Sequence, residues 1–85
     1  MVSKEDMRLK IKAFGITKEI VGGREIVVET NIQTVAELRE ELKTKYPALL
    51  KLKSLFIAVN SKYSDDGLAL HETDEIALIP PVSGG

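Results

Sequence analysis

The residue types best suited to chemistry stand at the end of the sequence. They are Pro80, Pro81, Val82, Ser83, Gly84 and Gly85. Glycine has no Cβ, so Gly84 and Gly85 could carry a terminal carboxylate into a channel too narrow for other residues. Pro80 and Pro81 have fixed φ angles and would stiffen the exit from the fold. The extended segment spans roughly 20 Å, enough to reach a buried site; a Gly-Gly pair in isolation would more simply be a frayed terminus.

Other candidate residues are weaker. His71 is the only histidine and the sequence has no cysteine, which excludes thiolate metal sites, disulfides and a cysteine nucleophile. No base lies beside Ser83 in the sequence, and Asp65-Asp66 precedes a glycine as a solvated turn would. Gly22-Gly23 lacks the pattern of a phosphate-binding loop. We therefore expect neither a metal site nor a stand-alone enzyme, because the sequence offers no set of acid, base and metal-binding residues that would form a catalytic site.

Charge is distributed unevenly along the sequence. The twelve Lys and Arg residues all lie at or before Lys62, whereas residues 63–85 carry only acidic charges. These charges belong to Asp65, Asp66, Glu72, Asp74 and Glu75. Two interpretations stay open: a solvated surface, or a patch that steers the tail toward a basic partner site. Lys51 and Lys53 add positive charge without an aromatic-rich basic face, so nucleic-acid binding is not expected.

Four segments are predicted as strands from alternation or β-branched content: 8–14, 24–30, 55–60 and 75–79. Alternation in the first strand directs Leu9 and Ile11 to the core and Phe14 to the other face. In the last strand the predicted core residues are Ile76 and Leu78, which leaves Ala77 and Ile79 on the face with Phe14. Residues 16–21 are too few for their pattern to be assigned, and one helical turn is the structure considered for them.

The main helix is predicted to begin at a capping box. The Thr34 hydroxyl can accept from the amide of Glu37, whose carboxylate can reach back to the start of the helix. Its apolar stripe consists of Val35, Leu38 and Leu42. Pro47 should end the helix near residue 45 or 46.

One amphipathic helix can cover one face of a four-stranded sheet, which predicts an α+β fold with its helix on a single side. The expected organisation is an N-terminal extension (1–7), one domain (8–79) and an extended tail (80–85). Residues 1–7 lack the apolar segment of a secretion signal, and no apolar run is long enough to span a membrane. We expect a cytoplasmic protein without membrane contact.

The ending Pro-Pro-Val-Ser-Gly-Gly resembles the C-terminus of the MoaD/ThiS family of ubiquitin-like proteins, which includes the small subunit of molybdopterin synthase. Phe14–Gly22 resembles the family's segment after the first strand, and Ala58-Val59-Asn60 resembles its third strand. The resemblance covers nearly the whole sequence from Met7 onward. It implies the β-grasp fold, with a mixed sheet.

The resemblance also implies a function. An ATP-using, E1-like enzyme would adenylate the Gly85 carboxylate, which then becomes a thiocarboxylate, with Gly84 beside it in the reacting tail. The sulfur would pass to a cyclic pyranopterin monophosphate in molybdenum cofactor biosynthesis. The expected partners are that enzyme and the large subunit of molybdopterin synthase, in a 2+2 heterotetramer. No cofactor would be bound by this chain itself.

The sheet face that the helix leaves uncovered is partly apolar near the last strand, which suggests a contact surface, and together with the tail it predicts a partner surface. It would consist of Phe14, Ala77, Ile79, Pro80, Pro81, Val82 and Ser83. Three alternatives remain: a sulfur carrier for thiamine thiazole synthesis or tRNA thiolation, a ubiquitin-like modifier joined to lysines through Gly85, and a binding module with an inert tail.

Overall fold

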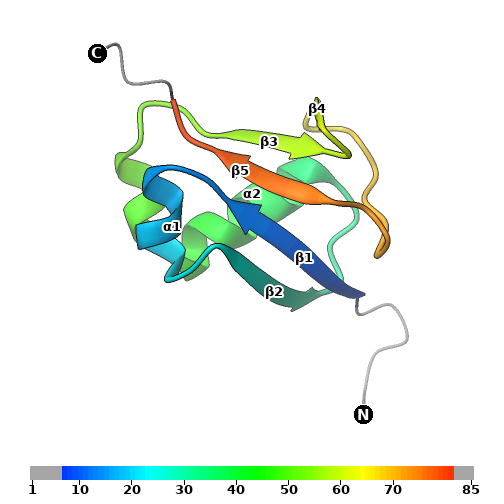
Figure 1. Ribbon diagram of the computed structural model, residues 1–85. Helices are drawn as coiled ribbons and strands as arrows, with labels where there is room; N and C mark the ends of the chain where they lie inside the picture. Colours follow the sequence, from blue (N-terminus) through cyan, green and yellow to red (C-terminus); the bar gives the residue numbers. More distant parts are fainter. Residues whose placement is uncertain (1–6, 82–85) are drawn as a thin grey trace.

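A mixed sheet with the strand order β2-β1-β5-β3-β4 organises residues 7–81, the part of the chain that this computed structural model describes (Figure 1). Its strands are β1 (Met7–Ala13), β2 (Glu25–Thr30), β3 (Phe56–Val59), β4 (Lys62–Tyr63) and β5 (Ile76–Ile79). β1 and β5 pair in parallel, and the other neighbours are antiparallel. The described chain's first and last strands therefore lie side by side in the middle of the sheet.

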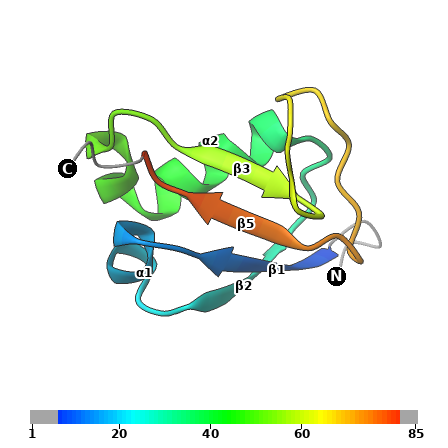
Figure 2. The same cartoon turned by 45° about the horizontal axis from the view of Figure 1, so that its top comes forward.

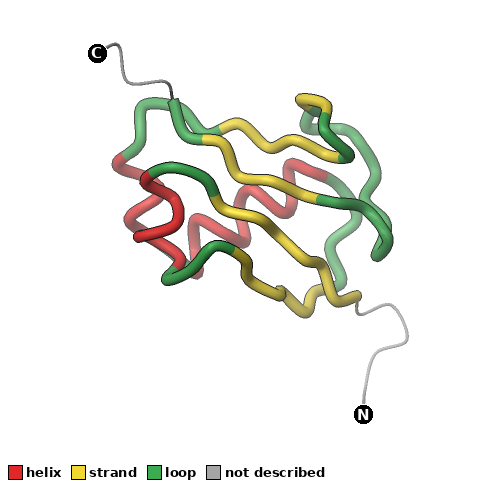
Figure 3. Tube along the Cα trace, in the orientation of Figure 1, coloured by secondary structure: helices red, strands yellow, loops and turns green. Residues whose placement is uncertain are grey.

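Helices cover one face of this sheet. The main helix, α2 (Val35–Lys45), crosses it behind the strands, as Figures 2 and 3 show. The short α1 (Ile16–Val21) follows β1, and a 3-10 helix, η1 (Pro47–Lys51), follows α2. Val35, Leu38 and Leu42 are fully buried, so the predicted apolar stripe of α2 is confirmed.

The start of α2 has the predicted capping box. The Glu37 amide donates to the Thr34 hydroxyl over 3.3 Å, and the Thr34 amide donates to the Glu37 carboxylate over 3.1 Å. The Gln33 amide donates to the same carboxylate oxygen over 2.8 Å. These backbone hydrogen bonds, that from Gln33 first, hold the pKa of Glu37 below its ordinary value because they favour the charged form.

The core lies between the sheet and α2. Leu9, Ile11, Ile76 and Leu78 are each at most 1% exposed, so the predicted core-facing set is confirmed. Together with the α2 stripe they form one continuous apolar cluster. The other face of the sheet carries no helix in the described part of the chain. Ala77 and Ile79 alternate with the buried Ile76 and Leu78 and belong to that face, as predicted, whereas Phe14 follows the end of β1 and is 49% exposed.

The structure differs from the prediction in three elements. The sheet has five strands, because the two-residue β4 follows a tight turn at Asn60 and Ser61, whose φ angles are 54° and 71°. A strand of two residues is too short to show alternation. Residues 16–21 form a complete α-helix, and η1 was not predicted. Strand ends differ by one residue, so Phe14 lies just after β1.

None of the helices within residues 7–81 is long and apolar enough to cross a membrane.

Thr34→Ala should lower the free energy of unfolding by about 1 kcal/mol, because the Glu37 amide loses its acceptor. Thr34→Ser should retain most of the stability, since it keeps the hydroxyl. Urea denaturation at neutral pH measures both. A loss for Thr34→Ser as large as that for Thr34→Ala would show that the hydroxyl is not the stabilising group.

The lowered pKa of Glu37 adds a pH test to the same experiment. Its stabilising contribution is complete above the carboxyl's unfolded pKa and is lost as the pH falls through the folded pKa. Glu37→Gln should therefore be less stable than the wild-type chain at neutral pH and approach it in acid. A stability difference that does not change with pH would contradict this role for the carboxylate.

Candidate functional site at the base of the tail

The tail leaves the fold from the C-terminal end of β5. Val82, Ser83, Gly84 and Gly85 lie outside the described residues, so the site can be built only up to Pro81. Leu78 is fully buried, whereas Ile79, Pro80 and Pro81 are half-buried. The described part of the tail therefore stays in contact with the domain; we call Ile79–Pro81 the tail base.

Hydrogen bonding between β5 and β1 ends just before the tail base, whereas Ile79 still pairs with Phe56 of β3. The Phe14 amide donates to the Leu78 carbonyl over 3.2 Å, one step past the Ala13–Leu78 pair that closes the parallel ladder. Pro80 and Pro81 have no N–H group and cannot extend either ladder. The chain therefore leaves the sheet from the end of its middle strand, β5, between β1 and β3.

Gly15 lies directly against the tail base. Its φ angle is +57°, which L-residues rarely adopt. A Cβ on Gly15 would lie 2.9 Å from Cγ of Pro80, closer than real Cβ contacts allow. The turn after β1 therefore packs so closely against the tail base that only a glycine fits at position 15 without a clash.

Thr17 holds the same turn in place. It is fully buried, accepts from the Phe14 amide over 2.9 Å, and donates its hydroxyl hydrogen to the Phe14 carbonyl. Both backbone groups of Phe14 are thereby fixed, while 49% of the residue remains exposed. Both residues lie in the segment that resembles the family, but the sequence analysis gave neither a role. The contact of Gly15 with Pro80 joins residues far apart in the sequence, so no local pattern marks it.

The sheet face opposite α2 carries an apolar patch beside the tail base. The strand register pairs Phe56 with Ile79, and Ala58 with both Ala77 and Tyr63. The rings of Phe56 and Tyr63 have centroids 5.4 Å apart, and these residues are 47% and 71% exposed. We call five apolar residues here the open-face patch: Phe14, Phe56, Tyr63, Ala77 and Ile79. Ala58, which joins them in the strand register, is only 5% exposed.

Three of the patch residues were predicted from the sequence to belong to a partner surface: Phe14, Ala77 and Ile79. Phe56 and Tyr63 were missed. Alternation within 55–60 could have assigned Phe56 to this face, but no local pattern places Tyr63 beside it. An exposed apolar patch of this kind is typical of an interaction surface.

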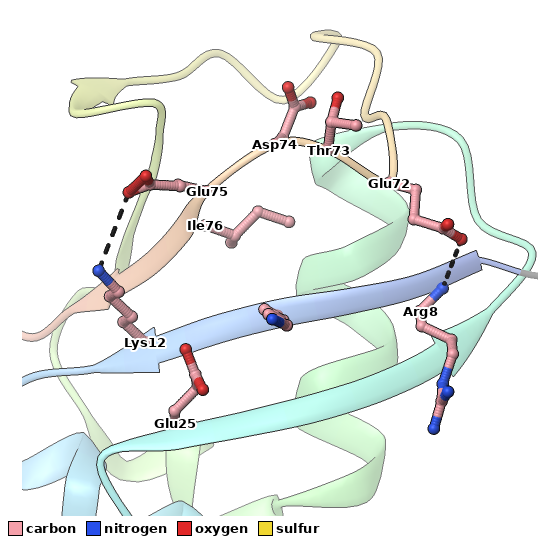
Figure 4. A pocket seen from close by; sticks show the side chains of 9 residues that line it. Arg8, Lys12, Glu25, Glu72, Thr73, Asp74, Glu75 and Ile76 are labelled. Atoms are coloured by element: carbon pink, nitrogen blue, oxygen red, sulfur yellow. Dashed lines mark hydrogen bonds and ion pairs between the residues drawn. The ribbon is translucent and has the colours of Figure 1, made fainter.

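The acidic segment does not surround the tail base. Its residues precede β5, at the end of the sheet opposite to the tail (Figure 1). A groove over β1 and the start of β5 includes Glu72, Asp74 and Glu75 (Figure 4). Glu75 lies 3.9 Å from the Lys12 ammonium, and Glu72 accepts from the Arg8 amide over 3.1 Å.

Asp66 pairs with Arg39 over 3.4 Å. The interpretation that the acidic residues steer the tail is therefore not favoured, because several have local partners and they flank the other end of β5.

The remaining candidates have structural roles or none. The Gly22 amide caps α1 by donating to the Lys18 carbonyl, with a φ angle of 88°. His71 is exposed, and no cluster of metal-binding side chains occurs among residues 7–81. What the described arrangement can do chemically is hold a tail in a fixed direction beside an apolar surface.

Gly15→Ala should lower the free energy of unfolding by about 2 kcal/mol, through backbone strain at positive φ and the contact with Pro80. Gly22→Ala is the matched control, since its φ angle is also positive but its Cβ would meet nothing within 4 Å. Urea denaturation compares the two. Equal losses would show that the approach to Pro80 does not constrain the fold.

Comparison with known proteins agrees with this geometry. The model of the ThiS family matches residues 11–85. A molybdopterin synthase sulfur carrier subunit of Caenorhabditis briggsae is 42% identical over 81 residues, covering 91% of this chain and 96% of the relative. That of Homo sapiens is 34% identical over 83 residues, covering 92% and 94%.

Among solved structures, the chain is similar to one in the complex of subunits 1 and 2 of the molybdopterin-converting factor from Helicobacter pylori. The TM-score is 0.66 at 29% identity, covering 93% of this chain and all of that one. It is also similar to small archaeal modifier protein 1 from Methanosarcina acetivorans, with a TM-score of 0.75 at 26% identity and coverage of 94% and 98%. The β-grasp prediction is thereby confirmed, and the chain belongs to the ThiS family of ubiquitin-like sulfur carriers, together with the molybdopterin synthase small subunits.

Proposed function

We propose that this chain is the sulfur carrier subunit of a molybdopterin synthase, with Gly85 as the residue that carries sulfur. The observation that carries the proposal is structural. The central strand β5 ends in a proline-fixed tail base beside the open-face patch, and Gly84 and Gly85 follow it within the segment that the ThiS family model matches. The relatives named as such subunits, matched along nearly the whole chain, support the same assignment.

The chemistry requires activation, because a free carboxylate is a poor electrophile. In the proposed cycle the Gly85 carboxylate attacks the α-phosphorus of ATP on an E1-like enzyme, releasing pyrophosphate and forming an acyl-adenylate. A sulfide-level nucleophile then displaces AMP and leaves a thiocarboxylate. After sulfur passes to the cyclic pyranopterin monophosphate, hydrolysis returns Gly85 to a carboxylate. The chain itself holds no cofactor in this cycle.

This chain's contribution is to deliver the tail, and it is non-catalytic in isolation. A domain docked through the open-face patch would hold the thiocarboxylate inside the partner's active site, which makes sulfur transfer effectively intramolecular. The large subunit would supply substrate binding and proton transfer. The similar Helicobacter pylori chain, which occurs in a complex of two subunits, supports a large-subunit partner here. We propose a 2+2 heterotetramer.

A second function is favoured by one observation, the likeness to the small archaeal modifier protein. In that case Gly85 would be joined to lysines of other proteins, after the same adenylation. Detection of isopeptide-linked Gly85 on other proteins of the host would support it. A carrier role in thiamine thiazole synthesis or tRNA thiolation would use the same tail with another sulfur acceptor.

Phe14→Asp and Ile79→Asp should each weaken binding to the large subunit by about 10- to 100-fold, because interface cores exclude unpaired charge. Glu40→Lys is the matched control, since Glu40 lies on α2, on the other side of the sheet. Glu41 is unsuitable, because its carboxylate accepts from the buried Thr30 hydroxyl over 2.9 Å. Calorimetry measures the affinities. Equal effects of the three variants would show that another face binds.

The thiocarboxylate form of the chain, mixed with a molybdopterin synthase large subunit and the pyranopterin precursor, should yield the dithiolene product. Deletion of Gly85 should abolish sulfur loading while the melting temperature stays unchanged. A peptide of residues 80–85 bearing the thiocarboxylate should be a far poorer donor, since it lacks the docking surface. Thiazole formation without dithiolene product would reassign the chain to another carrier branch. Full activity without Gly85 would refute the carrier role.

A further inference from the structure

Asn60 links two segments that lie far apart in the sequence. Its side-chain carbonyl accepts from the Glu75 amide over 3.0 Å, and its side-chain amide donates to an oxygen of Asp74 over 3.0 Å. Its backbone amide also donates to the Glu75 carbonyl over 2.7 Å. One residue thus fastens the turn between β3 and β4 to the segment that enters β5.

Asp74 is itself held in place. Its second carboxylate oxygen accepts from the His71 amide over 2.8 Å, and its backbone amide donates to the His71 carbonyl over 3.0 Å. Each oxygen of the Asp74 carboxylate therefore accepts one hydrogen bond, one from the Asn60 side-chain amide and the other from the His71 backbone amide. We call the hydrogen bonds among Asn60, His71, Asp74 and Glu75 the Asn60 lock.

Two requirements select asparagine at position 60. The turn is a two-residue hairpin with positive φ at both positions, where Asn is favoured and most residues are strained. The side chain must also offer one acceptor and one donor at the same time. Aspartate satisfies the first requirement but would place a second carboxylate against Asp74. Glycine satisfies it with no side chain at all.

The consequence of the lock appears a few residues further along the chain. β4 contains only Lys62 and Tyr63, so few ladder hydrogen bonds hold it. It is anchored on one side by the Asn60 lock and on the other by Ser64, whose amide and hydroxyl both donate to the Ile57 carbonyl over 3.1 and 2.8 Å. Tyr63 lies between these anchors, with its ring against Phe56.

We propose that Asn60 is a positioning residue for partner binding: the Asn60 lock holds the β3–β4 hairpin so that Tyr63 completes the open-face patch beside Phe56. This inference rests on the proposed function, because it assumes that the patch binds the large subunit. Aromatic side chains presented in a fixed position contribute strongly to interfaces, and their loss of order reduces affinity.

A reciprocal exchange tests the lock. Asn60→Asp should weaken binding to the large subunit about tenfold, because two carboxylates now face each other. Asp74→Asn alone should weaken it too, since one of its two hydrogen bonds is lost.

The double variant N60D/D74N should restore the lock with its two side chains exchanged. The new carboxylate at position 60 can accept from the Glu75 amide and from the new side-chain amide at position 74. The side-chain carbonyl at position 74 can still accept from the His71 amide. The affinity of the double variant should therefore return to within about twofold of the wild-type value.

Thr34→Ala is the control for stability, because it destabilises the N-terminal end of α2 and Thr34 is not part of the patch. All affinities are measured by calorimetry at a temperature where circular dichroism shows the variants folded. If Asn60→Asp does not fold, Asn60→Gly replaces it, since glycine keeps the positive φ and removes the side chain.

The inference is supported if the Asn60 variants bind weakly, the double variant binds normally and Thr34→Ala binds as the wild type does. Wild-type affinity of the Asn60 variants, or a double variant as weak as Asn60→Asp, would overturn it. If the wild-type chain itself does not bind the large subunit, the proposed function fails instead, and the two failures are therefore distinguishable.

Discussion

The parallel pairing of β1 with β5 is the constraint on which the rest of the structure depends. Ile11 aligns with Ile76 and Ala13 with Leu78, which places two apolar layers under α2. Parallel neighbours cannot be joined by a tight turn, so the chain must cross over, and α2 lies within that crossover. Because β5 runs in the same direction as β1, its C-terminal end meets the turn that contains Phe14 and Gly15. This pairing therefore brings the tail base and the turn together at one end of the sheet, and the pairing of β3 with β5 and β4 adds Phe56 and Tyr63 beside them.

The elements that were predicted correctly are those determined by a few consecutive residues. The capping box of Thr34 and Glu37 needs only four residues, and the alternation in β1 needs seven, so both were recognised correctly. β4 was missed because a strand of two residues is too short to show the alternation of polar and apolar residues. The η1 helix was missed because Pro47 was interpreted only as the end of α2. Phe56 and Tyr63 lie on one face only through their common neighbour Ala58, and such a register is absent from any local pattern.

The acidic segment shows how proximity in the sequence can mislead. Asp74 and Glu75 precede the tail by only a few residues, which suggested that they act together with it. β5 lies between them, and its four residues in extended conformation carry the chain to the opposite end of the sheet. The residue types of the tail were recognisable because the chemistry of a terminal Gly-Gly does not depend on the fold. The residues that surround the tail base, in contrast, are determined entirely by the fold.

The central position of β5 also has a mechanical consequence. A force applied to the tail along the strand acts roughly perpendicular to the hydrogen bonds that join β5 to β1 and β3. Such a force is shared among the bonds of both ladders, whereas an edge strand pulled sideways would lose its bonds one at a time. An enzyme that grips the tail tightly can therefore transmit tension to the domain without peeling it open. The attachment of the tail is therefore strongest against a force along β5, because both ladders resist it together.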